Sequence, residues 1–250
     1  MTWMNRKFSD AFGLSLALVL ATVLSSRLEA QSEAVSINPP MTFALNDLAL
    51  SVLSERQGNR ITNVNVVGYV DIDIPPGFSM IANHLTRRDN SVGELFPGVP
   101  EGTTIYKFDP VSQSFSANEF AAGAWTNPDE TLLPGEGAFI KNPTTNTLRW
   151  TIVGEVLQGT STNDIPAGLS IRSFVLPMGI PLEAMGFPAE LGDTVFRFDP
   201  VTQQYTSHVN IYGEWLPPCK LTVGEAFFVL RAKAAFWVHT FNISAPIIGP

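Results

Sequence analysis

The chain has 250 residues, of which 45% are apolar and only 15% are charged, and it contains 19 Gly and 19 Pro. This composition excludes an intrinsically disordered chain, because 17 Phe and 5 Trp side chains can bury enough apolar surface for one or two cores. The formal net charge of −8 argues against a nucleic-acid partner, which would require a basic patch. Low charge with many Gly and Pro favours short strands joined by tight turns.

Residues 1–30 have the three parts of a secretory signal peptide. Arg6 and Lys7 give a positive start, residues 11–24 are uncharged and mostly apolar, and Ala30 is a small residue at the expected cleavage point. The apolar stretch is shorter than the roughly 20 residues that a membrane span needs. We therefore predict a signal peptide, a secreted protein (extracellular, at the cell surface or in the periplasm) and no membrane span in the mature chain.

Residues 31–63 form an N-terminal segment between the signal peptide and the first repeat. Asn46 is a suitable N-cap residue for a short helix over residues 47–56, and Gly58 is a suitable residue to end it. The pattern thus predicts one short helix in this segment.

Two segments about 90 residues apart are nearly the same. Residues 104–113 read TIYKFDPVSQ and residues 194–203 read TVFRFDPVTQ, so six of the ten positions are identical and the other four are conservative exchanges. Further glycines, prolines and aromatic residues recur at the same offset. Since self-similarity of this kind decides the architecture, we predict two β repeats at 64–153 and 154–245, followed by a short tail at 246–250.

Each copy is expected to consist of β-strands. Residues 104–108 alternate in character, Asp109-Pro110 favours a turn, and an extended pattern resumes at 114–116, which predicts a β-hairpin. We expect six or seven short strands per copy. The fold class predicted is all-β, a tandem of two antiparallel β-sandwich-like repeats of about 90 residues. The tandem is either two rigidly packed domains or two halves of one.

The common motifs of catalytic and cofactor sites are lacking. The sequence has no phosphate-binding loop, no paired Cys, no HExxH and no GxSxG. The three histidines, His84, His208 and His239, do not occupy matching repeat positions. Cys219 is the single cysteine, and a small semi-buried residue is favoured there over a reactive nucleophile or an intermolecular bridge. We predict no catalytic residue, no cofactor and no metal.

Carboxylates at matching positions of the two copies are the alternative catalytic candidates. Glu136 and Glu225 each follow a glycine, and a carboxylate pair can act as acid and base in glycoside cleavage. Equivalent positions of two units normally lie far apart, so a carboxylate that binds turn amides is favoured at both. Asp109 and Asp199, each before a proline, are assigned a local backbone role in hairpin loops.

Two tryptophans are the best ligand-binding candidates. Trp125 and Trp215 follow a glycine in a predicted loop, where an exposed indole would stack on a sugar ring. A Trp at the same place in both copies is also typical of a core anchor, and this interpretation is favoured. Tyr106 and Phe196, which lie within predicted strands, are expected in the core.

The first copy resembles a repeat of uncharacterised secreted bacterial proteins in three segments, PPGFSMIAN (75–83), IYKFDP (105–110) and GAWTNPDETLLPGEGAFIKNP (123–143). It is also similar to the "GWNLIGNP…YYYDP…PGQGFFVK" β-sandwich modules of bacterial cell-surface proteins. The likeness is looser in the second copy, where Arg172-Ser173-Phe174 replaces the expected Ile-Ala-Asn. The resemblance implies a β-sandwich fold and carries over no active site.

These observations predict an exported, non-enzymatic β-sandwich tandem with a structural, surface-association or adhesion role. Its expected partner is a cell-surface or extracellular polysaccharide or protein. The alternative is a carbohydrate-binding module that uses Trp125 and Trp215, and a weaker alternative is a glycoside hydrolase-like enzyme that uses Glu136 or Glu225. Specificity is expected where the copies differ, in loops such as 84–98 and 207–221.

Overall fold

The described chain is built almost entirely from antiparallel strands. The computed structural model describes residues 49–57 and 60–242, with side chains from residue 66 onward, and these residues belong to one compact unit. They form fifteen strands, one short α-helix and one short 3-10 helix. The all-β prediction is confirmed, whereas the predicted signal peptide (1–30) and tail (246–250) lie outside the described residues.

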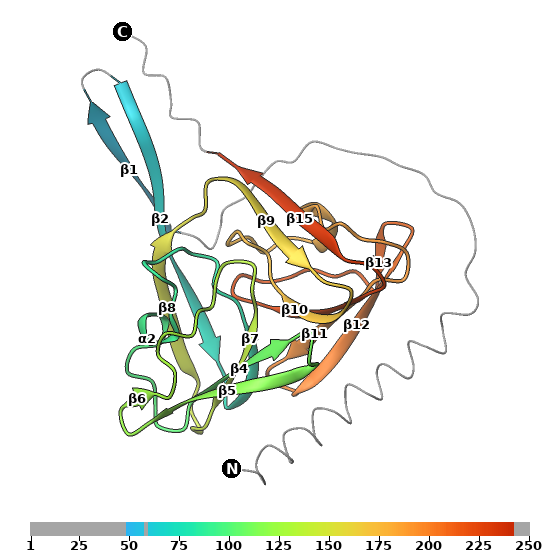
Figure 1. Ribbon diagram of the computed structural model, residues 1–250, viewed down its shortest axis with the longest axis horizontal. Helices are drawn as coiled ribbons and strands as arrows, with labels where there is room; N and C mark the ends of the chain where they lie inside the picture. Colours follow the sequence, from blue (N-terminus) through green and yellow to red (C-terminus); the bar gives the residue numbers. More distant parts are fainter. Residues whose placement is uncertain (1–48, 58–59, 243–250) are drawn as a thin grey trace. The chain divides into compact units, whose positions relative to one another are not determined.

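The elements are shown in chain order in Figure 1. The first nine are β1 (Ala49–Gln57), β2 (Arg60–Ile74), β3 (Gly77–Ile81), α2 (Val92–Leu95), β4 (Thr104–Asp109), β5 (Ser114–Ala121), β6 (Ala124–Trp125), β7 (Ala138–Asn142) and β8 (Leu148–Glu155). The others are β9 (Gly159–Ile165), β10 (Gly168–Arg172), η1 (Leu182–Met185), β11 (Thr194–Asp199), β12 (Gln204–Ile211), β13 (Glu214–Leu216), β14 (Phe227–Arg231) and β15 (Ala235–Phe241).

A strand replaces the helix that the sequence predicts over residues 47–56. β1 pairs antiparallel with β2, from Ala49 opposite Tyr69 to Gln57 opposite Arg60. The prediction was wrong because it weighed only a local capping signal. It did not consider that β2, rich in β-branched residues, offers β1 a long pairing partner.

Two five-stranded sheets have equivalent strand orders. One sheet runs β3-β7-β4-β5-β6 and the other β10-β14-β11-β12-β13. Each sheet is accompanied by a strand pair, β2 with β8 and β9 with β15, and β1 extends the first pair. We call residues 60–155 (β2–β8) the first half and residues 159–241 (β9–β15) the second half. Each half has seven strands, within the expected six or seven, and residues at the same place in both halves are called matched residues.

The two predicted hairpins are present. β4 pairs with β5 from Thr104 to Asp109, and β11 pairs with β12 from Thr194 to Asp199. In the first turn the Asp109 carboxylate accepts the Val111 amide hydrogen at 2.9 Å, and Asp199 accepts from the matched amide at 2.8 Å. The local backbone role predicted for both aspartates is therefore confirmed.

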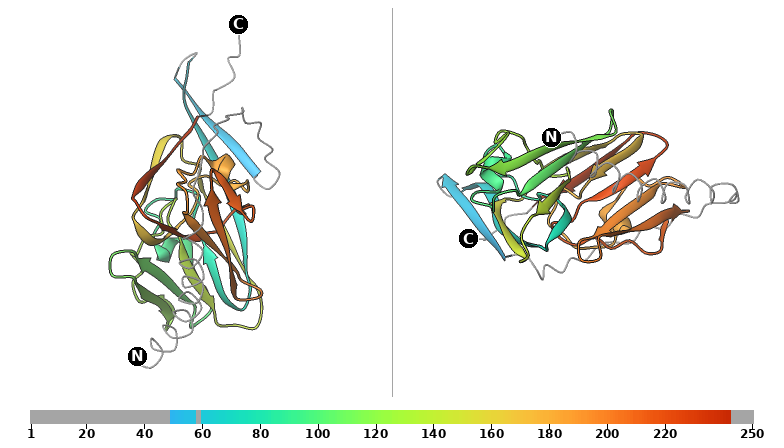
Figure 2. Two further views of the ribbon diagram at one scale, coloured as in Figure 1. Left: turned by 90° about the vertical axis from the view of Figure 1, so that its right-hand side faces the viewer. Right: turned by 90° about the horizontal axis from the view of Figure 1, so that it is seen from below.

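Aromatic side chains from both five-stranded sheets pack against one another. The rings of Phe108 and Phe228 have centroids 5.3 Å apart, and those of the matched pair Phe198 and Phe139 are also 5.3 Å apart. Phe139 and Phe228, which match each other, are in contact at 6.2 Å. Figure 2 shows the two sheets side by side, with β4–β5 in green and β11–β12 in orange. The expectation that Tyr106 and Phe196 are core residues is also confirmed, since both are buried.

Hydrogen bonds between the halves come in matched pairs. The amide of Ala82 donates to the Gly224 carbonyl at 2.8 Å, and the matched amide of Ser173 donates to the Gly135 carbonyl at 3.0 Å. The Gln203 side chain donates to the Phe78 carbonyl (2.9 Å), and its match Gln113 donates to the Leu169 carbonyl (3.2 Å). Since Phe78 and Leu169 are matched as well, the two hydrogen bonds are equivalent. Reciprocal contacts of this kind are typical of an interface between two like surfaces.

Candidate functional site

A groove of about 440 Å³ opens between the two halves. We call it the inter-half groove. Residues of β2 and β3 form its first wall, and the β11–β12 hairpin with the turn before β14 forms its second wall. The lining residues that matter for its chemistry are Ile72, Ser79 and Met80 from the first half and Arg197, His208 and Glu225 from the second.

An ion pair holds the second wall in place. The Arg197 guanidinium donates to both carboxylate oxygens of Glu225, through Nε at 2.6 Å and Nη2 at 2.8 Å. Glu225 also accepts from the amide and the hydroxyl of Thr222, both at 2.9 Å. The hydrogen bond with Glu225 raises the pKa of Arg197 above its ordinary value. Four donors thus occupy the Glu225 carboxylate, which confirms its predicted role as an acceptor of turn amides.

Glu136 has the same local role in the first half. Its carboxylate accepts the Leu133 amide hydrogen at 2.9 Å and the Lys107 ammonium group at 3.1 Å. Lys107 matches Arg197, so each glutamate is paired with a cation from its own half. Both repeated glutamates therefore stabilise the turn that precedes them by accepting one of its backbone amide hydrogens.

His208 is a buried polar residue of the groove wall. The side chain is 4% exposed, and its Nδ1 lies 2.8 Å from the Pro217 carbonyl oxygen. A carbonyl only accepts, so Nδ1 carries the hydrogen and Nε2 of the neutral ring is left as an acceptor. This Nε2 and the Ser79 hydroxyl, which is also buried in the groove wall, have no hydrogen-bond partner among the described residues.

The residue that matches His208 in the first half is Asn118, and its amide is fully engaged in local contacts. The Asn118 side chain donates to the Asn127 carbonyl at 2.6 Å and to the Glu130 carboxylate at 2.9 Å, and its oxygen accepts the Asn127 amide hydrogen. Sequence reasoning missed His208 because it looked for repeated chemistry. The feature of the sequence that distinguishes this position is that a histidine in the second half replaces an asparagine in the first.

The other two histidines lie outside the groove. His84 is buried and donates from Nδ1 to the Phe174 carbonyl at 2.7 Å. Burial lowers the pKa of His84 to about 4, so the ring is neutral at pH 7. His239 packs edge-on against the Phe174 ring, and partial burial lowers its pKa as well. Within the part of the chain that is described, no three His, Cys, Asp or Glu side chains are grouped so that they could hold a metal ion.

Cys219 is a buried thiol in the second half. Burial raises its pKa to about 12, so the sulfur stays protonated near neutral pH. Because the thiolate is the reactive form of cysteine, this environment suits a packing residue. The structure thus agrees with the packing role favoured for this cysteine, and the residue is more fully buried than predicted.

The two candidate sugar-binding tryptophans are in the core. Trp125 is 6% exposed and Trp215 is 2% exposed. The Trp125 indole N–H donates to the Phe96 carbonyl at 3.0 Å, and its ring packs edge-on against Phe96. Trp215 packs edge-on against Phe187. The exposed stacking platform that the carbohydrate-binding alternative requires at these positions is therefore absent, because each indole is covered by a phenylalanine.

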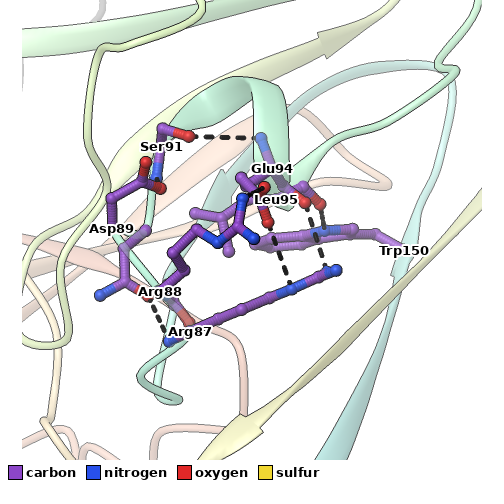
Figure 3. A network of polar contacts seen from close by, with 9 residues as sticks. Arg87, Arg88, Asp89, Ser91, Glu94, Leu95 and Trp150 are labelled. Atoms are coloured by element: carbon purple, nitrogen blue, oxygen red, sulfur yellow. Dashed lines mark hydrogen bonds and ion pairs between the residues drawn. The ribbon is translucent and has the colours of Figure 1, made fainter.

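A second pair of tryptophans completes this arrangement. Trp150 of β8 and Trp237 of β15 are matched residues, which the sequence analysis did not pair. The Trp150 indole donates to the Leu95 carbonyl at the end of α2 (2.7 Å; Figure 3). The Trp237 indole donates to the Met185 carbonyl at the end of η1 (3.0 Å). Each half thus ties its one short helical turn to the core through the same indole contact.

A polar network fixes the loop that carries α2 (Figure 3). The Ser91 hydroxyl accepts the Glu94 amide hydrogen and caps the helix, while the Asp89 carboxylate accepts the Ser91 amide hydrogen. The Ser91 hydrogen bonds hold the pKa of Asp89 below its ordinary value. The Glu94 carboxylate lies 3.6 Å from Arg87 and 3.1 Å from Arg88. The adjacent residues Arg87 and Arg88 therefore both pair with a carboxylate of their own loop.

The outer faces of the two strand pairs differ. On the first pair, Asp71 accepts from Arg149 at 2.7 Å and from Thr151 at 2.5 Å, and these bonds lower the pKa of Asp71. The residues of β15 that match Arg149 and Thr151 are Phe236 and Val238. These two side chains are 65% and 54% exposed. At these two positions the first half thus presents polar side chains and the second half apolar ones, while Tyr69 and Val153 on the same face of the first half are 46% and 51% exposed.

Comparison of the chain with known family models, with curated proteins and with solved structures finds no match. In the described ranges, no helix is both long and apolar enough to cross a membrane.

Proposed function

We propose that this protein is an exported, non-enzymatic tandem of two copies of one β-sandwich-like unit, and that it acts by associating with a cell surface or extracellular material. The equal strand orders and the reciprocal contacts between the halves support the two-copy organisation. Those contacts follow the rule of a two-fold interface, in which residue i contacts j and j contacts i. The approximate axis passes near Phe139 and Phe228, which match and touch each other.

The observation that carries the surface-association role is the outer face of β9–β15. Phe236 and Val238 are alternate residues of one strand, so they point to the same side, and both are more than half exposed. Aromatic residues exposed beside other apolar groups are typical of contact surfaces. At the two matched positions the first half has Arg149 and Thr151, so apolar side chains are not a requirement of the scaffold at these positions.

A partner with an apolar or ring-bearing surface suits this face, such as a cell-surface polysaccharide or an extracellular protein. Burial of a Phe and a Val side chain supplies about 1.5–3 kcal/mol each. That amount changes an affinity by roughly tenfold or more per residue. Loss of both side chains would therefore release the protein from the surface.

The test compares two double variants of the mature protein on isolated envelopes of cells that export it. Phe236→Asp with Val238→Asp should lower the retained fraction by about tenfold or more. The control is Val111→Asp with Val201→Asp, which changes two exposed valines of hairpin turns and should leave retention unchanged. Equal retention of the Phe236/Val238 variant and the unchanged protein would refute the proposed surface.

A further inference from the structure

We propose that the inter-half groove binds a neutral, hydroxyl-rich ligand, a saccharide or polyol, with His208 and Ser79 as its main polar contacts. This site is separate from the β15 face and goes beyond the surface-association role. The groove volume of about 440 Å³ lies in the range of small-molecule sites, roughly 300–1,000 Å³.

The first argument is the pair of buried polar atoms in the groove walls. His208 Nε2 and Ser79 Oγ are buried and have no hydrogen-bond partner among the described residues. Nearly all buried polar atoms in proteins have a partner, and leaving one unpaired is costly. With Nδ1 donating to the Pro217 carbonyl, Nε2 of the uncharged ring is an acceptor. A ligand hydroxyl can donate to Nε2 and can also accept from the Ser79 hydroxyl, so one group type satisfies both.

The second argument is that the charged groups around the groove are already balanced. Arg197 and Glu225 form a two-point ion pair. The Asp199 carboxylate accepts two amide hydrogens of its own turn, and Asp73 lies opposite Arg149 on the neighbouring strand. An anion would face these carboxylates, and a cation would face Arg197. A neutral polar ligand therefore suits the groove best.

The third argument comes from the matched region of the other half. There Asn163 donates to the Gly135 and Ser173 carbonyls at 2.9 and 3.0 Å, and Arg172 donates to the Asp164 carbonyl at 2.5 Å. Asn163 and Arg172 thus supply that region with donors of the protein itself, although the hydroxyl of Ser170, which matches Ser79, has no hydrogen-bond partner among the described residues either. In the groove, the residues matched to Asn163 and Arg172 are isoleucines (Ile72 and Ile81) that line the walls and donate nothing. A ligand can supply the donors instead.

The apolar part of the walls fits the same ligand class. Ile72, Met80, Phe198 and Val223 line the groove together with the polar residues. A sugar ring has an apolar C–H face and a hydroxyl edge, so it can pack on such side chains while its hydroxyls reach polar groups. Mixed walls of this kind suit a saccharide better than a purely apolar compound.

The experiment titrates the full mature protein with three neutral disaccharides, maltose, cellobiose and lactose. Calorimetry measures binding, and NMR follows the imidazole C–H signals of the three histidines. We expect at least one disaccharide to bind and to shift the His208 signal selectively, at concentrations of about 10 mM or lower. The His84 signal, from a buried histidine outside the groove, should stay in place.

Substitutions then locate the bound sugar. Thr206→Trp places a large ring at an exposed edge of the groove and should weaken binding at least tenfold. Ser116→Trp makes the same change at the matched exposed residue of the other half and should have no effect. Ser79→Ala and His208→Gln should each weaken binding several-fold. Thr206 and Ser116 are both exposed, so neither Trp should prevent folding.

Three outcomes would overturn the groove proposal. One is no calorimetric or NMR response to any of the three sugars. Another is binding that is equal in the Thr206→Trp and Ser116→Trp proteins. The third is a His208 response to inorganic phosphate or spermidine without a response to sugars. The Phe236/Val238 double variant should bind the disaccharide normally, so failure of the groove and failure of the surface-association role are told apart.

Discussion

The first and second halves bury matched aromatic residues at several positions, such as Trp125 and Trp215, and differ in the polar residues beside them. In the first half, the buried Asn142 amide donates to the Ile74 and Asn146 carbonyls at 3.0 and 2.7 Å. The matched residue of the second half is Arg231. It is buried, lies 3.2 Å from the Asp193 carboxylate and donates to the Pro188 carbonyl at 3.0 Å.

This difference shows which features the scaffold requires. Both halves place a phenylalanine between two tryptophans, with Phe96 stacked on Trp150 in the first half and Phe187 edge-on to Trp237 in the second. The polar group at the end of β7 and β14 differs, because an amide with carbonyl partners stands in one half and an ion pair in the other, where Arg231 Nε and Nη1 have no hydrogen-bond partner among the described residues. Polar residues can therefore differ between the halves at matched positions that do not take part in the aromatic contacts.

The largest change in stability is expected when the buried ion pair between Arg231 and Asp193 is removed from the second half. Arg231→Met leaves the Asp193 carboxylate buried without its cation and should lower the free energy of unfolding by about 3–5 kcal/mol. Urea denaturation of the mature protein measures this. The double variant Arg231→Asn with Asp193→Thr installs the first-half residues and should recover most of the loss. A single variant as stable as the unchanged protein would show that the pair is not needed for stability.

The next effect concerns His84, whose matched residue in the second half is Val175. Burial holds the His84 pKa at about 4, below the unfolded value of 6.5. Between these values the unfolded state binds the proton first, so stability is intact above pH 6.5 and falls as pH drops toward 4. The loss should reach about 3 kcal/mol.

His84→Val installs the second-half residue and removes this titrating group. Stability curves of both proteins between pH 7 and pH 4 should therefore not be parallel, and the fall should be steeper in the unchanged protein. Parallel curves would contradict the assigned pKa. A constant offset is expected as well, because the Phe174 carbonyl loses its donor.

The smallest effect concerns the outer face of β15. Phe236→Asp with Val238→Asp should change the free energy of unfolding by no more than about 0.5 kcal/mol per residue, since both side chains are largely exposed. Thermal unfolding of this variant and of the Val111/Val201 control should agree closely. A large destabilisation would mean that the apolar face belongs to the core and is not a contact surface.

Local patterns in the sequence predicted local structure well. The hairpins around Asp109 and Asp199, the buried strand residues Tyr106 and Phe196, and the turn role of Glu225 follow from alternation and turn chemistry. These interactions involve residues close in the sequence, so neighbouring residues determine them. The helix over 47–56 failed because its alternative, pairing with β2, depends on a partner strand outside the local window.

The sequence by itself determined the β class, the turns, and the recurrence of aromatic and glycine residues about 90 positions apart. Only the tertiary structure decided which repeated residues are exposed and which unrepeated residues meet. Trp125 and Trp215 are buried because Phe96 and Phe187, from distant loops, cover them. Ser79 and His208 line the same groove although more than a hundred residues separate them in the sequence, and contacts between sheets are not encoded in local periodicity.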